Sequence, residues 1–311
     1  MDSRSASYQD LLKSGNLTKR VEDAISLLKN CHICAHECGV NRIEGQLGFC
    51  NTGCKALVSS YGRHLGEEDP IRGKYGSGTI FFSRCNLRCQ YCQNFDISQR
   101  SAGDEVEPED LAYIMLELQE MGCHNINLVS PSHVVPQILA GLLIAATAGL
   151  NIPLVYNTGG YDHLDTLTLL NGIIDIYMPD MKYADPEIAQ HYSQISNYPQ
   201  VNQNAVKEMH RQVGDLICDD LGVAYRGLLI RHLILPNNLA GTKNILEFIA
   251  EDISKGTYIN LMDQYRPAYH AHKFPELNRR ITSKEYRESL NIARKLGLDR
   301  LDQRHSHFLQ F

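Results

Sequence analysis

Apolar and polar positions change their spacing twice along the chain. Residues 8–30 repeat apolar side chains at helical spacing around a Ser-Gly-Asn break, which predicts an N-terminal helical segment. Residues 31–78 are rich in Cys and Gly and show little periodicity. We interpret them as a knuckle or wrapped segment that is organised around something other than an apolar core.

After Gly78, short apolar runs alternate with longer stretches of helical spacing. The predicted strands are 79–83, 126–130, 153–157, 173–178, 228–235 and 258–262. The predicted helices are 108–121, 133–149, 162–171, 186–213, 242–254 and 283–297. Six βα units in series imply a parallel sheet with helices outside it.

Six units over roughly 220 residues favour a partial (β/α)6 TIM-like barrel over an eightfold barrel, which takes about 250 residues. An open doubly wound sheet is the alternative. In either architecture the active site lies at the carboxyl ends of the strands. We therefore expect an α/β fold with two domains, an N-terminal helix and Cys-rich extension over 1–75 and the barrel over 76–311.

Composition restricts the class of protein. The chain has 311 residues, a formal net charge of −6, 43% hydrophobic and 21% charged residues, which is typical of a globular protein rather than a disordered or fibrous one. The longest apolar run, 138–150, is too short to span a bilayer. The first residues lack the apolar core of a secretory signal. The acidic balance argues against a nucleic-acid surface. We expect a cytoplasmic protein that binds neither membrane nor nucleic acid, with the tail residues His305 and His307 at the surface.

Ten cysteines are unusual for such a chain. Without a secretory signal they are better explained as metal ligands or catalytic thiols than as disulfides. Five crowd residues 31–54 and three lie within residues 85–92. Only Cys123 and Cys218 stand alone, and we interpret these two as small buried apolar residues.

The motif Cys85-Asn-Leu-Arg-Cys89-Gln-Tyr-Cys92 directly follows the predicted strand 79–83. Three thiolates within eight residues can hold one iron–sulfur cube, and since such a cube normally takes four cysteines, one iron is left open. An open coordination position distinguishes a reactive metal site from a structural one. The competing interpretation is a zinc knuckle, which usually pairs two Cys-x2-Cys motifs and needs a fourth ligand.

This motif, with Tyr91 before its third cysteine, resembles that of the radical S-adenosylmethionine (SAM) superfamily. The resemblance implies a [4Fe-4S] cluster on Cys85, Cys89 and Cys92, with the open iron chelated by SAM. It also implies reductive cleavage of SAM to methionine and a 5′-deoxyadenosyl radical that abstracts hydrogen from a substrate. By the same resemblance, Tyr91 stands beside the adenine.

Further segments are similar to glycyl-radical activating enzymes such as pyruvate formate-lyase activating enzyme. Cys92-Gln-Asn-Phe-Asp96 matches their Cys-x-Asn-x-Asp stretch, and Asp180-Met-Lys182 matches their Asp-x-Lys motif. Lys182 is suited to hold the SAM carboxylate and Asp180 to accept a hydroxyl or ammonium group; a salt bridge at a helix entry is the plainer interpretation. The resemblance adds further candidate SAM or cation contacts: Asn157, Thr158, Arg231 and Arg266.

The sequence departs from these enzymes after the second predicted strand of the barrel. They carry Gly-Gly-Glu there, where this chain has Val129-Ser-Pro-Ser-His133. Ser130 and Ser132 are the candidates to accept the hydrogen bond of the SAM amino group. His133 is either a site residue or the first turn of a helix. The whole chain also resembles a branch of uncharacterised radical SAM iron–sulfur proteins, in which no substrate is settled.

The N-terminal cysteines form a second candidate metal site. Cys31, Cys34, Cys38 and Cys50 supply four thiolates to zinc or to a second iron–sulfur cluster, which would relay electrons to the first. Unligated thiols are the other alternative. His64, Glu67 and Glu68 either line the mouth of the active site or are solvated charges.

These patterns lead us to expect a radical SAM oxidoreductase. Its expected substrate is a protein, of the kind that glycyl-radical activating enzymes modify, and its expected electron donor is a flavodoxin or ferredoxin. Radical modification of another peptide or a small metabolite is the first alternative. A zinc-organised binding protein without enzymatic activity is the second.

Overall fold

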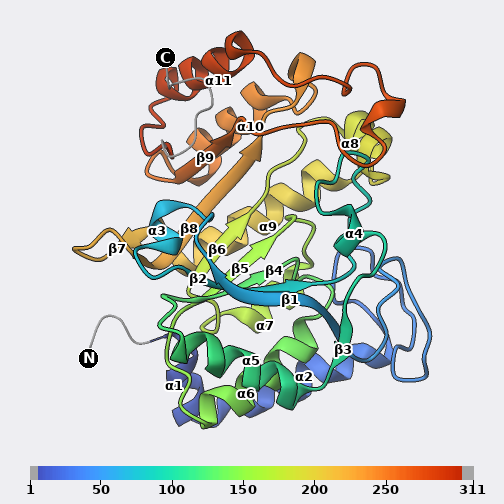
Figure 1. The fold of residues 1–311 in the computed structure, drawn as a ribbon, viewed down its shortest axis with the longest axis vertical. Helices are drawn as coiled ribbons and strands as arrows, with labels where there is room; N and C mark the ends of the chain where they lie inside the picture. The colour runs from blue at the N-terminus through green and yellow to red at the C-terminus, as the bar shows by residue number, and fades with distance from the viewer. Residues whose placement is uncertain (1–5, 303–311) are drawn as a thin grey trace.

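The computed structural model describes residues 6–302, so His305 and His307 lie outside the described part. Within this range one nine-stranded sheet runs in the order β3-β1-β2-β4-β5-β6-β8-β7, and β9 pairs with β8 (Figure 1). Consecutive parallel pairs join six of these strands: β2 (Ser77–Phe82), β4 (Ile126–Val129), β5 (Leu154–Thr158), β6 (Ile176–Pro179), β8 (Ala224–Leu233) and β9 (Tyr258–Met262).

The sequential order of the parallel strands distinguishes the two predicted architectures. A doubly wound sheet reverses its order at a switch point, whereas here each parallel strand lies beside the next one in the chain. The sheet does not close into a full barrel. One end is β3, and at the other end β8 pairs with both β7 and β9. The expected partial barrel is therefore confirmed, and the doubly wound alternative is wrong.

Helices cover the outside of the sheet. The N-terminal helices α1 (Tyr8–Lys13) and α2 (Asn16–Ser26) separate at Gly15, as predicted, because its φ of +74° ends the first helix. Figure 1 shows α2 beside α5 and α6 at one end of the molecule, and α10 and α11 beyond β9 at the other. The remaining helices are α3 (Asp69–Arg72), α4 (Phe95–Ser98), α5 (Pro108–Glu120), α6 (Val135–Thr147), α7 (Leu164–Leu170), α8 (Pro186–Ser193), α9 (Tyr198–Val213), α10 (Thr242–Phe248) and α11 (Ser283–Lys295).

The single helix predicted over 186–213 is wrong. The chain forms two helices, α8 and α9, because Gln194 at the end of α8 takes a left-handed conformation with φ +61°. Pro199 then stands in the first turn of α9, where a missing N–H costs nothing.

The interpretation of the whole of 31–78 as a knuckle or wrapped segment is also wrong in part. Residues Ala56–His64 form β1, which pairs antiparallel with β2 along its length and with β3 (Asp104–Val106) on its other side. The first three residues of β1 are buried in succession rather than alternately, so the period-two signal of a strand is weak there. The strand β7 (Ile217–Cys218) was not predicted, because two residues are too few to show a periodic pattern.

A small apolar cluster fills the inside of the barrel and supports the carboxyl ends of its strands. Its main strand residues are Val155, Ile176, Met178 and Leu229, and Ile71 of α3 packs with them. Asn157, Asp180 and Arg231 each follow one of these residues by two positions. Since side chains alternate along a strand, these three polar side chains face the same interior, above the cluster.

Candidate functional site

The carboxyl ends of the parallel strands surround a cavity of about 610 Å³, its open mouth included. Its lining combines the loop after β2 with the ends of β4, β5, β6 and β8. Most of the predicted residues meet here: the lining includes Cys85, Cys89, Cys92, Asn157, Thr158, Asp180, Lys182 and Arg231. The cavity therefore joins a three-thiol loop to a group of charged side chains, as expected for a barrel site.

Each thiol of the loop has a hydrogen-bond partner. The Leu87 amide donates to Cys85 Sγ at 3.4 Å, and the Ser193 hydroxyl donates to Cys89 Sγ at 3.1 Å. Cys92 Sγ lies 3.2 Å from the Ser98 hydroxyl. Burial raises the pKa of Cys85 to about 12 and also raises the pKa of Cys89. Cys85 and Cys89 therefore need a bound cation before they ionise at neutral pH. Hydrogen bonds such as these orient ligating sulfurs.

Asp180 binds two cations in the cavity wall. Lys182 Nζ donates to its Oδ2 at 2.6 Å, and Arg231 Nε donates to its Oδ1 at 3.0 Å. Arg231 also donates from Nη2 to Asn157 Oδ1 at 2.5 Å. Burial alone would raise the pKa of Asp180, but the charges of Lys182 and Arg231 outweigh it and hold that pKa below its ordinary value. The site therefore keeps a carboxylate and two cations charged at its edge.

The Asp180–Lys182 pair is a wall of the cavity rather than only a helix-entry salt bridge. Both side chains line it, with 16% and 18% of their side-chain surface exposed. Lys182 is the only lysine among the lining residues within the described part of the chain. It is consequently the one primary amine placed to meet an anionic group of a bound molecule.

The turn that replaces Gly-Gly-Glu places one of its two serines in the cavity. Ser130 lines the wall with a φ of +59° and donates its amide to Asn157 O at 2.9 Å. Ser132 lies behind the wall, 2.9 Å from the Thr158 hydroxyl, which donates to Asp162 at 2.7 Å. A positive φ is uncommon outside glycine, so the backbone at Ser130 is held in its strained conformation by the sheet.

Two predicted contacts lie elsewhere. Tyr91 is buried and does not line the cavity; its ring packs edge-on against Tyr183 and Tyr265, with centroids 6.3 and 5.9 Å away. Arg266 is exposed and is not among the lining residues. Neither residue therefore lies in the cavity wall.

Glu67 and Glu68 are buried, so they are not solvated charges, and neither lines the cavity. Glu67 lies 3.4 Å from His64 and 3.9 Å from Arg231. Glu68 accepts a hydrogen bond from Asn260 at 2.7 Å, and burial raises its pKa. Glu67 therefore supports Arg231 from behind the site.

Sequence reasoning missed part of the wall. Ser98 and Gln99 follow the loop at the end of α4, and Gly159 follows Thr158. Ser98 and Gln99 carry no spacing signal, since a four-residue helix is too short for periodicity. Gly159 directly follows the predicted contacts Asn157 and Thr158 and could have been found from them.

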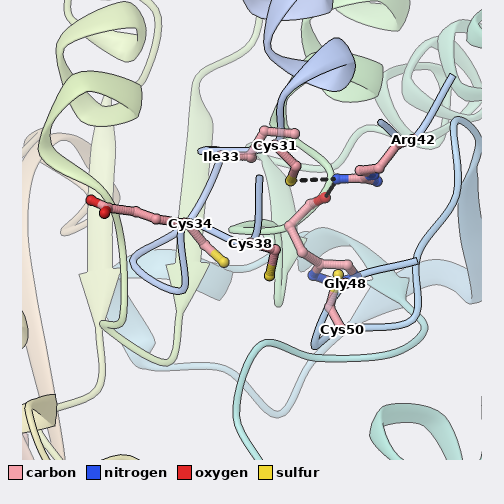
Figure 2. A pocket seen from close by; sticks show the side chains of 9 residues that line it. Cys31, Ile33, Cys34, Cys38, Arg42, Gly48 and Cys50 are labelled. Carbon is pink, nitrogen blue, oxygen red and sulfur yellow. Dashed lines mark hydrogen bonds between the residues drawn. The ribbon is translucent and has the colours of Figure 1, made fainter. Parts of the chain in front are cut away.

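The four predicted N-terminal ligands also come together. Cys31, Cys34, Cys38 and Cys50 line a second pocket, with His133 among its other lining residues (Figure 2). His133 is buried, and its Nε2 lies 3.0 Å from Ser83 O, just before the three-thiol loop. His133 therefore lies between the two cysteine groups and not in the larger cavity.

Among residues 6–302, no group of three or more His, Cys, Asp or Glu side chains is arranged as it stands to hold a metal ion. No helix in this range is both long and apolar enough to cross a membrane.

Known proteins share this sequence pattern and fold. The family model of the radical SAM superfamily matches residues 79–249, which include the three-thiol loop and every strand from β4 to β8. An uncharacterized protein of Methanocaldococcus jannaschii is 34% identical over 301 residues, which are 94% of this chain and 83% of that protein.

Two solved structures align with this chain, and the first of them shows a similar fold. A maturase of the [FeFe]-hydrogenase, HydG, aligns with a TM-score of 0.51 and 14% identity, covering 94% of this chain and 64% of its own. A radical SAM methyltransferase from Sphaerobacter thermophilus aligns with a TM-score of 0.47 and 11% identity, over 71% of this chain and again 64% of that chain. The chain thus spans slightly less than two thirds of either structure. The match of the family model over more than half of the sequence, together with the long relative, shows that this chain belongs to the radical SAM superfamily.

Proposed function

We propose that this protein binds a [4Fe-4S] cluster through Cys85, Cys89 and Cys92 and holds SAM in the adjoining cavity. The observation that carries this proposal is that the three thiols and the Asp180–Lys182–Arg231 group line one cavity. No fourth cysteine of the described residues lines it, which fits a cluster with one iron left for SAM. When bound and reduced, such a cluster supplies the electron that splits SAM into methionine and a 5′-deoxyadenosyl radical.

The protein's own residues bind and orient the substrate. Lys182 is the candidate partner of the SAM carboxylate, since an ammonium pairs well with it in a partly buried wall. Asp180 keeps Lys182 and Arg231 in place through its two short hydrogen bonds. Ser130 and Asn157 supply neutral oxygens in the same wall, where we infer that they accept hydrogen bonds from the SAM amino or hydroxyl groups.

We infer that the substrate is a protein loop, as in glycyl-radical activating enzymes. The cavity opens to solvent beside an unclosed sheet, so an extended peptide has room to approach. Asn94 of the Cys-x-Asn-x-Asp motif lines the cavity, whereas Asp96 forms an exposed ion pair with Arg100 at 2.8 Å. A flavodoxin or ferredoxin is the proposed electron donor.

The test is SAM cleavage by the anaerobically reconstituted protein. With dithionite as reductant, the protein should release 5′-deoxyadenosine, measured by chromatography. If none forms while the cluster is intact by iron and sulfide analysis, the proposed activity is wrong.

A second experiment tests the protein substrate. A glycyl radical signal in electron paramagnetic resonance (EPR), obtained after mixing with a candidate glycyl radical enzyme, would identify that substrate. SAM cleavage without any such signal would support the SAM chemistry but contradict the proposed substrate class.

A further inference from the structure

The pocket of Cys31, Cys34, Cys38 and Cys50 takes no part in the function proposed above. Figure 2 shows the four thiols turned toward one space. This space measures about 300 Å³, its open mouth included. The fifth N-terminal cysteine, Cys54, is exposed and does not line this pocket. Four of the five N-terminal cysteines therefore line the same pocket.

Arg42 places a buried positive charge in this pocket. The residue is 1% exposed; Nε donates to Gly53 O at 2.9 Å, and Nη1 donates to His133 O at 2.8 Å and lies 3.9 Å from Cys31 Sγ. Its Nη2 is buried without a hydrogen-bond partner. The one carboxylate in the lining, Glu37, pairs instead with His163 at 2.8 Å. A buried cation with an unused N–H is costly unless an anion satisfies it. The pocket is therefore built for a negatively charged group.

The backbone is shaped around one of the thiols. A Cβ atom at Gly48 would stand 2.8 Å from Cys38 Sγ, closer than real contacts allow. The next residue, Phe49, donates its amide to the same sulfur at 3.4 Å. An amide directed at a sulfur is one of the devices that tune iron–sulfur clusters. The glycine thus leaves the space that the ligating sulfur needs.

Four thiols suit either a tetrahedral zinc ion or a cubane in which each thiol binds a different iron. The contact between this pocket and the three-thiol loop favours the cubane, because zinc carries no electrons. We propose that Cys31, Cys34, Cys38 and Cys50 hold a second [4Fe-4S] cluster, in which the protein ligates every iron.

The two cysteine groups are in direct contact. His36, between two ligands of the second site, places Nε2 2.8 Å from the backbone oxygen of Asn86 in the three-thiol loop. Arg88 of that loop donates to Phe49 O at 2.7 Å and lies over the Phe49 ring, 4.5 Å from its centroid. The Phe49 ring in turn stacks on His36 with centroids 3.8 Å apart. The second cluster is therefore placed to pass electrons to the first.

The relay step, which rests on the proposed function, moves one electron. The second cluster is oxidised by one electron and the first is reduced by one. A one-electron reductant of low potential, outside the protein, then restores the second cluster. No bond forms or breaks within the pocket, so its closed ligand set suits this role.

Metal analysis tests the site itself. We expect about eight irons per wild-type chain and about four in a Cys85/Cys89/Cys92→Ala variant, from four irons per cluster. The reduced EPR signal of that variant should not respond to added SAM. Zinc in place of iron, or no metal at all, in a folded variant would overturn the proposal. A wild-type signal that ignores SAM would instead count against the proposed function, so the two failures are distinguishable.

A gentler variant guards against misfolding. Gly48→Ala leaves every thiol in the chain but displaces Cys38, and we expect iron to fall from about eight toward four while the SAM-sensitive signal persists. Gly62→Ala in β1 is the matched control, because a Cβ there meets nothing within 4 Å, and it should keep the wild-type iron. Equal iron content in Gly48→Ala and Gly62→Ala would contradict the proposal that Cys38 binds iron in this pocket.

Magnetic coupling tests the relay contact. In the fully reduced wild type the two clusters should broaden each other's EPR signals, and either cluster alone should give a sharp signal. The Cys85/Cys89/Cys92→Ala variant and a Cys34/Cys38→Ala variant supply the two separate spectra. If the wild-type spectrum equals their sum, the clusters do not communicate and the relay is wrong.

Discussion

The two cysteine groups differ in what surrounds them. The three thiols after β2 share an open cavity with Asp180, Lys182 and Arg231, whereas the four N-terminal thiols share a smaller pocket with the single cation Arg42. An open coordination position belongs to reactive sites and a complete ligand set to structural or electron-transfer sites. The comparison teaches that thiol count and neighbouring charge differ between the two groups, and this difference is the basis for proposing a different role for each.

The largest expected effect comes from removing a ligand of the three-thiol loop. Cys89→Ala should abolish 5′-deoxyadenosine formation with dithionite, because the cluster loses a thiolate and its support from Ser193. The exposed Cys54→Ala is the control and should retain wild-type turnover. Equal losses of 5′-deoxyadenosine formation in the two variants would contradict the proposal that the three-thiol loop holds the catalytic cluster.

Acid should destabilise the support of the open cavity. His232 is buried, donates from Nδ1 to Met181 O at 2.7 Å beside Asp180, and has its Nε2 2.9 Å from the Thr242 hydroxyl. Burial lowers its pKa from 6.5 to about 4. The unfolded state therefore binds the proton first, and the free energy of unfolding should fall as pH drops from about 6.5 to about 4, by about 3 kcal/mol.

Denaturant unfolding at several pH values measures this slope. A His232→Gln variant is less stable at neutral pH but should show a shallower slope over the same interval. An unchanged slope would mean that His232 does not titrate in this way, and that the acid response of the cavity has another source.

The charged wall of the cavity should affect the affinity for SAM but not the iron content. Lys182→Met removes the amine that faces the cavity, and a charged hydrogen bond of about 1.5–3 kcal/mol corresponds to a ten- to hundredfold weaker SAM affinity. Iron content should remain at the wild-type level. Lys243→Met is the matched control, because Lys243 is 64% exposed on α10. Calorimetric titration with SAM compares the two, and equal affinities would remove Lys182 from the SAM site.

The smallest effect is expected from Gly159→Ala at the cavity, because the added methyl group can be accommodated there, unlike the one added by Gly48→Ala in the second pocket. A Cβ at Gly159 would stand 2.6 Å from Leu87 Cδ1, the flexible end of a side chain that can turn away. Gly159→Ala should therefore weaken SAM binding only a few fold and leave iron content unchanged, unlike Gly48→Ala. Loss of iron in Gly159→Ala would show that the three-thiol loop is as tightly shaped as the second pocket.

Local patterns predicted most of the barrel and only part of its site. The strand 258–262 was predicted at its observed limits, since an apolar run between turns is a local signal. β1 was missed, because its first three residues are buried in succession and give no alternation. Cys85, Asp180 and Lys182 were found through motif spacing and lie together. Tyr91 shares that spacing, yet Tyr183 and Tyr265 hold its ring away from the cavity, and such packing depends on segments far apart in the sequence.

The pairing of β1 with β2 has a consequence for shortened forms of the protein. A cut at the predicted domain boundary, residue 75, would remove the strand that hydrogen-bonds to β2 from Val58 to His64. The freed edge would then expose unpaired backbone groups just before the Cys85 loop, and such edges recruit strands from other chains. We expect a fragment that begins at residue 76 to aggregate, measured by light scattering, because the N-terminal segment would no longer cover this edge of β2.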